Sequence, residues 1–324
     1  MESLVSKIKK NINPNILGLI GHTPLVQLNK TTAEIPAKVY AKLEFFNPTL
    51  STKDRIVQRI IEDAELKGLI KRGSVLVEAT SGNTGISIAV LSRIKGYKCI
   101  LCVKDTIANE KLEFLKTLTE EIVVCPANVL PDHPESYYSK AKEIVKNTPG
   151  AYYINQNFNP LNLQTHYNTT GREIWEAMRG EITHLIAAGS TGGTISGIGK
   201  FLKEQNPDIK VIGVDTQDSI LKYYHEHRTF DPHKRYRSGI PGVGKNIITG
   251  NFDFDIIDEF VIVDKENSAH WAKKLLLEDG IWAGQSSGAT LHGLWNVRER
   301  LNENDRVVVI FPDHGSRYLT DMYC

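Results

Sequence analysis

The sequence carries almost no net charge: 39 basic residues stand against 38 acidic ones, which leaves a formal charge of +1 at pH 7. A surface that binds nucleic acid needs a basic excess, so we expect no nucleic-acid partner. No apolar run approaches the roughly 18 residues that span a bilayer. The first 15 residues alternate lysine with apolar residues and do not form a signal peptide. We therefore expect a cytoplasmic protein with no membrane partner.

Cysteine is also scarce, with four residues in 324. Cys99 and Cys102 form a C-x-x-C motif, but the apolar residues around them predict a buried strand, in which these two side chains lie on opposite faces. No second C-x-x-C motif or histidine pair completes a zinc site. The sequence therefore predicts structural cysteines, a reducing compartment and no bound metal.

Length and pattern predict an α/β protein. A chain of 324 residues suits two domains with a cleft between them. Strand-like runs alternate with segments of helical spacing, and most of these strands are uniformly apolar, which is typical of parallel sheets covered by helices on both faces. The predicted strands are 39–45, 75–79, 98–103, 122–125, 151–154, 184–188, 211–215, 260–263 and 306–311, and the predicted helices include 51–67, 85–95, 110–117, 135–146 and 169–178.

The least regular stretch covers residues 223–255, where histidine, proline, arginine, lysine and glycine are frequent and neither period is sustained. We expect a loop or gate there. Its short basic run, residues 233–237, is either a solvated surface or a rim that attracts anions.

Three strand-like runs end in a cluster of glycine, serine and threonine and resume as a helix, at residues 80–85, 190–194 and 284–288. Each junction presents hydroxyls and free backbone N–H groups at a helix N-terminus, where the helix dipole favours anions. Alone, such a loop is a common structural turn. Three of them, with Lys53 after a fourth strand, predict one site for a phosphorylated cofactor and a carboxylate substrate.

Lys53 is predicted to stand at the start of a helix. The helix dipole and burial against a cofactor both favour its neutral amine, which can condense with an aldehyde. Pyridoxal phosphate enzymes use such a lysine as a Schiff base. Taken alone, Lys53 would be an exposed residue of a helix start. The surrounding loops favour the reactive lysine.

The motifs resemble those of fold-type II pyridoxal phosphate enzymes, in particular the branch of cystathionine β-synthase and cysteine synthase. They occur in family order over nearly the whole chain. Two further segments, residues 134–136 and 169–174, resemble the cystathionine β-synthase side. The main motifs are IGHTPL at 20–25, NPTLSTKDR at 47–55, TSGNTG at 80–85, STGGT at 190–194 and PDHGSRY at 312–318.

The resemblance implies a role for each matched residue. Lys53 would hold the cofactor as an aldimine and then move the proton of the substrate Cα as general base and acid. Asn83 would hydrogen-bond the 3-oxygen of the cofactor, and Ser286 would face its pyridine nitrogen. The phosphate loop would be Ser190, Thr191, Gly192, Gly193 and Thr194, and the substrate carboxylate would be held by Thr80, Ser81, Gly82, Asn83, Thr84 and Gln156.

The type of reaction is predicted from Ser286. A hydroxyl does not protonate pyridine, so the ring stays nearly neutral and is a weak electron sink. This favours loss of a β-substituent over transamination. The resemblance therefore implies β-replacement on L-serine or an O-activated L-serine through an aminoacrylate, with a thiol or sulfide as the acceptor.

Two departures from the family pattern leave the second substrate open. Asn157 and Lys245 stand where cystathionine β-synthases typically carry tyrosine. Lys245 is either an exposed lysine on a mobile loop or a ligand for an anion, which would be the phosphate of O-phosphoserine or a carboxylate of the nucleophile. The alternative function is the same chemistry with an amine acceptor and O-phosphoserine, as in diaminopropionate-forming relatives.

The resemblance also implies an architecture of two domains and a homodimer. The smaller domain would be residues 47–160, with Lys53 and the Asn83 loop, and the larger would be residues 1–46 and 161–324, with the phosphate loop and Ser286. We expect no haem, because the N-terminal segment lacks the cysteine and histidine of the haem-binding extension. We also expect no paired regulatory domains after Tyr318.

A remote alternative is an NAD-dependent dehydrogenase. The strand 184–188, its glycine loop and Asp215 at the end of the next strand imitate a dinucleotide-binding unit. However, the glycines at 189, 192, 193 and 197 do not give G-x-G-x-x-G.

Overall fold

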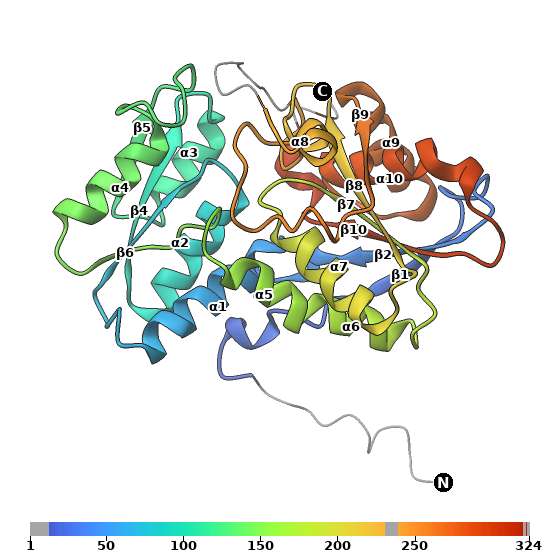
Figure 1. The fold of residues 1–324 in the computed structure, drawn as a ribbon. Coiled ribbons are helices and arrows are strands. Elements are labelled where there is room, and N and C mark those ends of the chain that lie inside the picture. The colour runs from blue at the N-terminus through green and yellow to red at the C-terminus, as the bar shows by residue number, and fades with distance from the viewer. Residues whose placement is uncertain (1–12, 231–238, 320–321, 323–324) are drawn as a thin grey trace, which may run out of the picture.

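A computed structural model describes residues 13–230, 239–319 and 322, which form two lobes, each built on its own sheet (Figure 1). The basic run at 233–237 lies outside the described residues. The strands are β1 (Leu25–Leu28), β2 (Lys38–Leu43), β3 (Val75–Ala79), β4 (Lys98–Lys104), β5 (Glu121–Cys125), β6 (Ala151–Tyr153), β7 (His184–Ala188), β8 (Lys210–Thr216), β9 (Glu259–Val263) and β10 (Arg306–Phe311). The helices are α1 (Lys53–Leu66), α2 (Asn83–Lys95), α3 (Asn109–Lys116), α4 (Tyr137–Asn147), α5 (Leu161–Asn168), α6 (Thr170–Ala177), α7 (Gly193–Gln205), α8 (Leu221–His227), α9 (Lys265–Asp279) and α10 (Gln285–Val297), with short 3₁₀ helices at Ile16–Leu19, Glu44–Phe46, Arg298–Arg300 and Gly315–Tyr318.

The larger lobe is built on a six-stranded sheet of order β1-β2-β10-β7-β8-β9, in which only β1 is antiparallel. Side chains along β10 alternate between two cores. Val307 and Val309 pack in the cluster that includes residues of α9 and α10, whereas Val308 and Ile310 pack in the cluster with residues of α6 and α7. Helices therefore cover both faces of this sheet, which explains why apolar residues stand on both faces of a strand such as β10.

The smaller lobe is built on a four-stranded parallel sheet of order β5-β4-β3-β6. Cys99 packs in the cluster with α1 and α2, and Cys102 packs in the cluster with α4. The prediction that these two cysteines lie on opposite faces of one strand is confirmed. Both are free thiols, as is Cys125.

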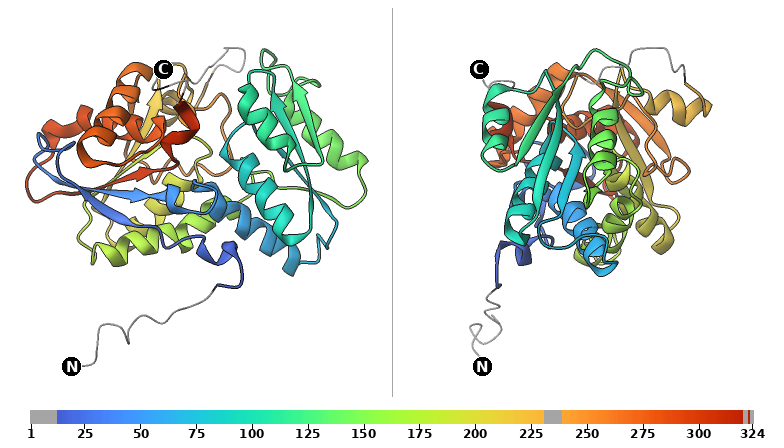
Figure 2. Two further views of the ribbon diagram at one scale, coloured as in Figure 1. Left: turned by 180° about the vertical axis from the view of Figure 1, so that it is seen from behind. Right: turned by 90° about the vertical axis from the view of Figure 1, so that its left-hand side faces the viewer.

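Helix α1 connects the two lobes (Figure 2). Its Ile56 and Ile60 pack in the core of the smaller lobe, yet the N–H of Thr52, just before the helix, donates to the Pro312 carbonyl of the larger lobe at 2.9 Å. We propose residues 47–160 as the smaller domain and residues 1–46 and 161–324 as the larger, because α1 and the four-stranded sheet lie within the first of these ranges.

The predicted loop at 223–255 is wrong at its start. Helix α8 extends to His227, whose ring stacks on Tyr223 with the centroids 4.2 Å apart, and it ends at Arg228 with φ 55°. Residues 239–255 contain no helix or strand.

In the described part of the chain, no helix is long and apolar enough to cross a membrane, and no three His, Cys, Asp or Glu side chains are grouped to hold a metal ion.

Candidate active site

A cavity of about 940 Å³ lies between the two lobes, at the carboxyl ends of the parallel strands. Residues from both lobes line it. The lining includes every predicted site residue except Gly193: Lys53, Thr80, Ser81, Gly82, Asn83, Thr84, Gln156, Ser190, Thr191, Gly192, Thr194, Lys245 and Ser286.

Lys53 is the first residue of α1, and contacts from the larger lobe fix its position. The preceding Ser51 forms a β-bridge with Asp313. Burial lowers the pKa of Lys53; the charge of Asp313 opposes this shift, and the charge of Lys245 adds to it. Among the described residues, the side-chain nitrogen of Lys53 has no hydrogen-bond or ion-pair partner. The protein thus favours a neutral, unengaged amine at this position.

The loop 80–84 leads into α2, whose first N–H groups have no acceptor within the helix. Ser81 Oγ accepts a hydrogen bond from the Lys104 N–H at 2.8 Å, which fastens the loop to β4. Thr84 Oγ1 donates to Gln156 Oε1 at 2.6 Å and brings Gln156 to the same loop. Hydroxyls, an amide and free N–H groups gathered at one helix N-terminus can bind a carboxylate.

The loop 190–194 requires glycine at two positions. Gly192 has φ 88°, and a Cβ there would lie 2.7 Å from the Phe252 side chain. A Cβ on Gly193 would lie 2.0 Å from Asn162 Oδ1. Gly193 therefore packs against α5, which explains why it does not line the cavity.

Helix α5 supports the hydroxyls of this loop. Asn162 Nδ2 donates to Thr191 Oγ1 at 3.2 Å, and His166 Nε2 lies 3.2 Å from Thr194 Oγ1. Burial lowers the pKa of His166 to about 3, so its ring is neutral at neutral pH. The threonine hydroxyls are thus held by neutral groups, which leaves the anion-binding field of the α7 N-terminus uncancelled.

Asp313 was missing from the predicted site residues, although it lies in the motif at 312–318. Its carboxylate is 2% exposed and accepts hydrogen bonds from Asn83 Nδ2 at 2.6 Å, from Tyr318 OH at 2.5 Å and from Ser286 Oγ at 3.5 Å. Asp313 therefore holds Asn83 across the cavity. The available signal was an acidic residue two positions after the apolar run 307–311.

These residues fit a phosphorylated aldehyde. Lys53 offers an amine without a partner, and the N-terminus of α7 offers an anion site. Asn83 Oδ1 is buried and has no hydrogen-bond partner in the described part of the chain, so it can accept from a ligand, and Nδ2, which donates to Asp313, carries a second hydrogen that can be donated to an oxygen of the ligand.

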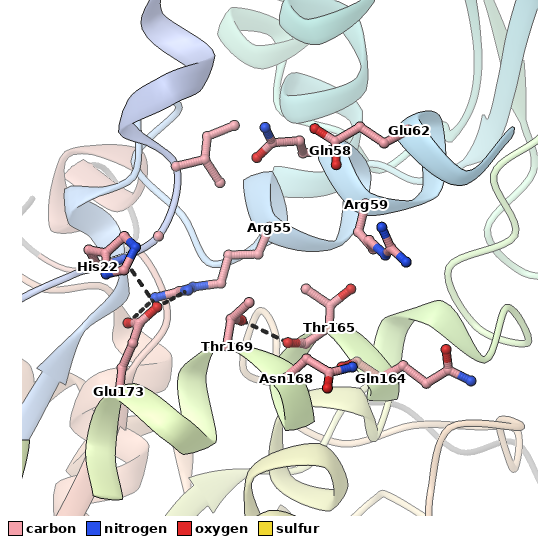
Figure 3. Close-up of a pocket in the computed structure, with 12 residues that line it drawn as sticks. His22, Arg55, Gln58, Arg59, Glu62, Gln164, Thr165, Asn168, Thr169 and Glu173 are labelled. Carbon is pink, nitrogen blue, oxygen red and sulfur yellow. Dashed lines mark hydrogen bonds and ion pairs between the residues drawn. The ribbon is translucent and has the colours of Figure 1, made fainter. Parts of the chain in front are cut away.

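A second cavity, of about 340 Å³, lies between α1 and α5 (Figure 3). Arg55 donates to Glu173 at 2.7 and 2.8 Å and to Glu44 at 2.7 and 2.9 Å, and Lys42 Nζ donates to Glu173 at 2.7 Å. Burial alone would raise the pKa of Glu44, but Arg55 outweighs it and holds the pKa at about 2. This buried network is paired within the protein, in contrast to Lys53.

Comparison with known proteins identifies the class. The family described as "Pyridoxal-phosphate dependent enzyme" matches residues 16–313. The chain is 39% identical over 316 residues to a protein named cystathionine beta-synthase from Apis mellifera, with 95% of this chain and 61% of that protein aligned. The structure of a hydrogen sulfide-producing enzyme from Fusobacterium nucleatum is 32% identical, with a TM-score of 0.84, and the match covers 95% of this chain and 98% of that chain.

A second solved structure, O-acetyl serine sulfhydrylase isoform 3 from Entamoeba histolytica, is 33% identical, with a TM-score of 0.85, and the match covers 97% of this chain and 92% of that chain. The chain spans less than two thirds of the length of the curated relative from Apis mellifera. The predicted resemblance and the predicted α/β fold of type II are confirmed.

Proposed function

The chain belongs to the family of pyridoxal-phosphate-dependent enzymes, and from that premise we propose that it catalyses β-replacement on L-serine or an O-activated L-serine, with a thiol or sulfide as the acceptor. One observation carries the proposal. Lys53, an amine without a partner among the described residues, lines the same cavity as Asn83 and the loop 190–194. The names of the relatives, a cystathionine beta-synthase and an O-acetyl serine sulfhydrylase, support this reaction class.

In this proposal the larger lobe holds most of the cofactor. The phosphate would be held by the loop at the N-terminus of α7, which consists of Ser190, Thr191, Gly192, Gly193 and Thr194. Lys53 would hold the aldehyde end, and Asn83 and Ser286 would bind the side of the 3-oxygen and the side of the ring nitrogen. When bound, pyridoxal phosphate supplies an electron sink for the bonds of the substrate Cα.

The smaller lobe binds the amino-acid substrate. The hydroxyls and N–H groups of residues 80–84 hold its carboxylate, and Gln156, fixed by Thr84, orients that carboxylate. The free amine of Lys53 removes the Cα proton and later returns a proton to the same carbon. Closure of the loop on the substrate excludes water.

Ser286 supports elimination over transamination. Its hydroxyl is too weak an acid to protonate a pyridine nitrogen, so the bound ring remains a modest electron sink. Asp313 lies 3.5 Å from Ser286 Oγ, but its carboxylate also receives hydrogen bonds from Asn83 and Tyr318. Loss of a β-substituent requires less electron withdrawal by the ring than transamination does.

An amine acceptor with O-phosphoserine is the second candidate. The contact between Lys245 and Asn157, at 3.0 Å, favours it, because these are the two positions that depart from the cystathionine β-synthase pattern.

The dehydrogenase alternative is withdrawn, because the chain belongs to the pyridoxal-phosphate family. Asp215, which would have bound a ribose, is fully buried and accepts a hydrogen bond from the Lys222 N–H at 2.9 Å.

We also propose that the protein is a cytoplasmic homodimer acting on small amino acids. The free, buried thiols of Cys99, Cys102 and Cys125 support a reducing compartment.

Two measurements test the proposed function. Borohydride reduction of the holoenzyme, followed by peptide mapping, should place a pyridoxyl group on Lys53. A matrix of donors (L-serine, O-acetyl-L-serine and O-phospho-L-serine) against acceptors (homocysteine, sulfide, cysteine and an amine), read by mass spectrometry, should yield a β-substituted alanine. A pyridoxamine product, or an adduct at another lysine, contradicts the proposal.

A further inference from the structure

Lys245 is held in place by the protein. Its N–H donates to Ser219 Oγ at 3.0 Å, and its carbonyl accepts from the Ile220 N–H at 3.0 Å. Its side-chain nitrogen donates to Asn157 Oδ1 at 3.0 Å, and Asn157 is only 2% exposed. The ammonium is therefore fixed at the cavity wall, and the expectation of an exposed lysine on a mobile loop does not describe it.

Lys104 is a second cation in the cavity lining, and it comes from the smaller lobe whereas Lys245 comes from the larger. Lys104 ends β4, and its N–H donates to Ser81 Oγ in the loop 80–84. Its ammonium lies over the Tyr137 ring, 5.0 Å from the centroid. Burial lowers the pKa of Lys104, and the charge of Lys245 lowers it further. The charge of Lys245 also lowers the pKa of Lys53, and all three lysines line the same cavity.

The protein does not neutralise these two cations. Among the described residues that line the cavity, Asp313 is the only carboxylate, and it accepts hydrogen bonds from Asn83 and Tyr318. No described carboxylate forms an ion pair with Lys104 or Lys245. Burial raises the pKa of nearby Glu78 to about 7, so Glu78 is only partly charged at neutral pH. Two half-buried ammonium groups without a counter-ion favour an anionic ligand.

We propose that Lys104 and Lys245, with Asn157 as the brace, form a subsite for an oxyanion carried by a substrate of the β-replacement reaction. This inference rests on the proposed function. The oxyanion is either the phosphate of O-phospho-L-serine or a carboxylate of the acceptor. In the first case Lys53 takes the Cα proton, the Cβ–O bond breaks and phosphate leaves with the bonding electrons. The nucleophile then bonds to Cβ, Lys53 returns the proton to Cα, and the proton lost by the nucleophile passes to the released phosphate.

The donor arm compares O-phospho-L-serine with O-acetyl-L-serine. Lys245→Gln and Lys104→Gln remove the charge, keep a terminal N–H donor and shorten the side chain by one atom. If the phosphate occupies the subsite, each variant lowers kcat/KM for O-phospho-L-serine by about tenfold or more, because a charge-assisted hydrogen bond is lost. The value for O-acetyl-L-serine should change less than about threefold. Lys98→Gln, an exposed lysine at the start of β4, is the matched control.

The acceptor arm uses O-acetyl-L-serine as the donor and compares mercaptoacetate with 2-mercaptoethanol. These thiols differ in the carboxylate. If the acceptor carboxylate occupies the subsite, the KM of mercaptoacetate rises by about tenfold in each glutamine variant, and that of 2-mercaptoethanol does not. Lys245→Arg retains the charge and should recover most of the preference, which separates the loss of charge from a defect in folding.

A binding measurement is independent of turnover. Calorimetric titration of the holoenzyme with inorganic phosphate should give a dissociation constant that rises about tenfold or more in both glutamine variants and is unchanged in Lys98→Gln. Unchanged selectivity in both arms, together with unchanged phosphate binding, overturns the subsite. A wild-type enzyme that uses no donor overturns the proposed function instead, and the phosphate titration still decides whether the subsite exists.

Discussion

Lys53 and Arg55 lie two residues apart on α1, and the structure treats their charges in opposite ways. Arg55 donates five hydrogen bonds, to Glu44, Glu173 and Thr23. Lys53 has no partner in the described part of the chain. Residues i and i+2 do not share a helix face, so one helix presents a paired charge towards one cavity (Figure 3) and an unpaired amine towards the other.

The difference separates a structural charge from a reactive one. Burying a charge is costly unless the protein pairs it. Around Arg55 two carboxylates offset that cost, and the network joins residues of β2, α1 and α6. Around Lys53 the charge of Asp313 opposes that cost only in part, and no described residue hydrogen-bonds or ion-pairs the amine, so the balance is left to a ligand. Incomplete pairing therefore marks the reacting side of α1.

The largest expected effect is on catalysis. Lys53→Ala should lower turnover by about 10²–10⁴-fold, because the proposed proton transfer at Cα is lost. The melting temperature of the apoprotein should stay the same or rise, because a buried amine is removed. Steady-state kinetics and calorimetry measure the two effects. A Lys53→Ala variant that kept its turnover would show that Lys53 is not the reactive residue of α1.

Arg55→Met should have the opposite profile. Removing Arg55 from this buried network leaves Glu44 without its ion-pair partner and Glu173 with Lys42 alone, and we expect a loss of about 3–5 kcal/mol in the free energy of unfolding. Denaturant unfolding of the apoprotein measures it. Arg59→Met, at an exposed position on the same helix, is the control and should change stability by about 0.5 kcal/mol or less. Equal effects of the two variants would contradict a structural role for Arg55.

The same network predicts how stability depends on pH. Glu44 has a folded-state pKa of about 2 against an ordinary 4.5, so its charged form stabilises the fold above pH 4.5. That contribution, about 3 kcal/mol, should be lost as the pH falls from 4.5 to 2. Unfolding measured across this range tests it, and Glu44→Gln should flatten the dependence. An equally steep loss in the variant would assign the effect to other carboxyl groups.

The smallest expected effect concerns how the cavity around Lys53 binds the cofactor. Asp313→Asn keeps the shape of the side chain but removes the charge that accepts from Asn83 and Tyr318. We expect pyridoxal phosphate to bind about tenfold more weakly, equivalent to about 1.4 kcal/mol, because Asn83 is less well held. Titration of the apoenzyme, followed by cofactor absorbance, measures it. Unchanged affinity would show that Asn83 does not depend on this contact.

Much of the fold could be predicted because the spacing of apolar residues in most segments fits either a strand or a helix. The apolar strand 306–311 is observed with the predicted bounds, and α2 begins two residues before its prediction, at Asn83. The clusters of glycine, serine and threonine were predicted to share one site. All of them line one cavity, because the carboxyl ends of parallel strands meet at the same edge of a sheet.

Contacts between distant residues could not be predicted from pattern. Asp313 bonds Asn83 across 230 positions, and Lys245 bonds Asn157 across 88. Helix α8 was missed because tertiary packing supports a sequence with weak periodicity: the ring of Tyr224 lies 4.9 Å from that of Phe254. Such pairings depend on the path of the chain through both lobes, which no single segment encodes.

The position of β10 has a consequence for how the chain matures on the ribosome. This strand lies between β2 and β7, although it is translated after all the other described strands. The four-stranded sheet, in contrast, comes from one continuous stretch of sequence, 75–153. Nascent chains halted before residue 306 would contain every strand of the four-stranded sheet. The six-stranded sheet would lack β10 at its centre, so the edges of β2 and β7 would be exposed to chaperones until β10 emerges.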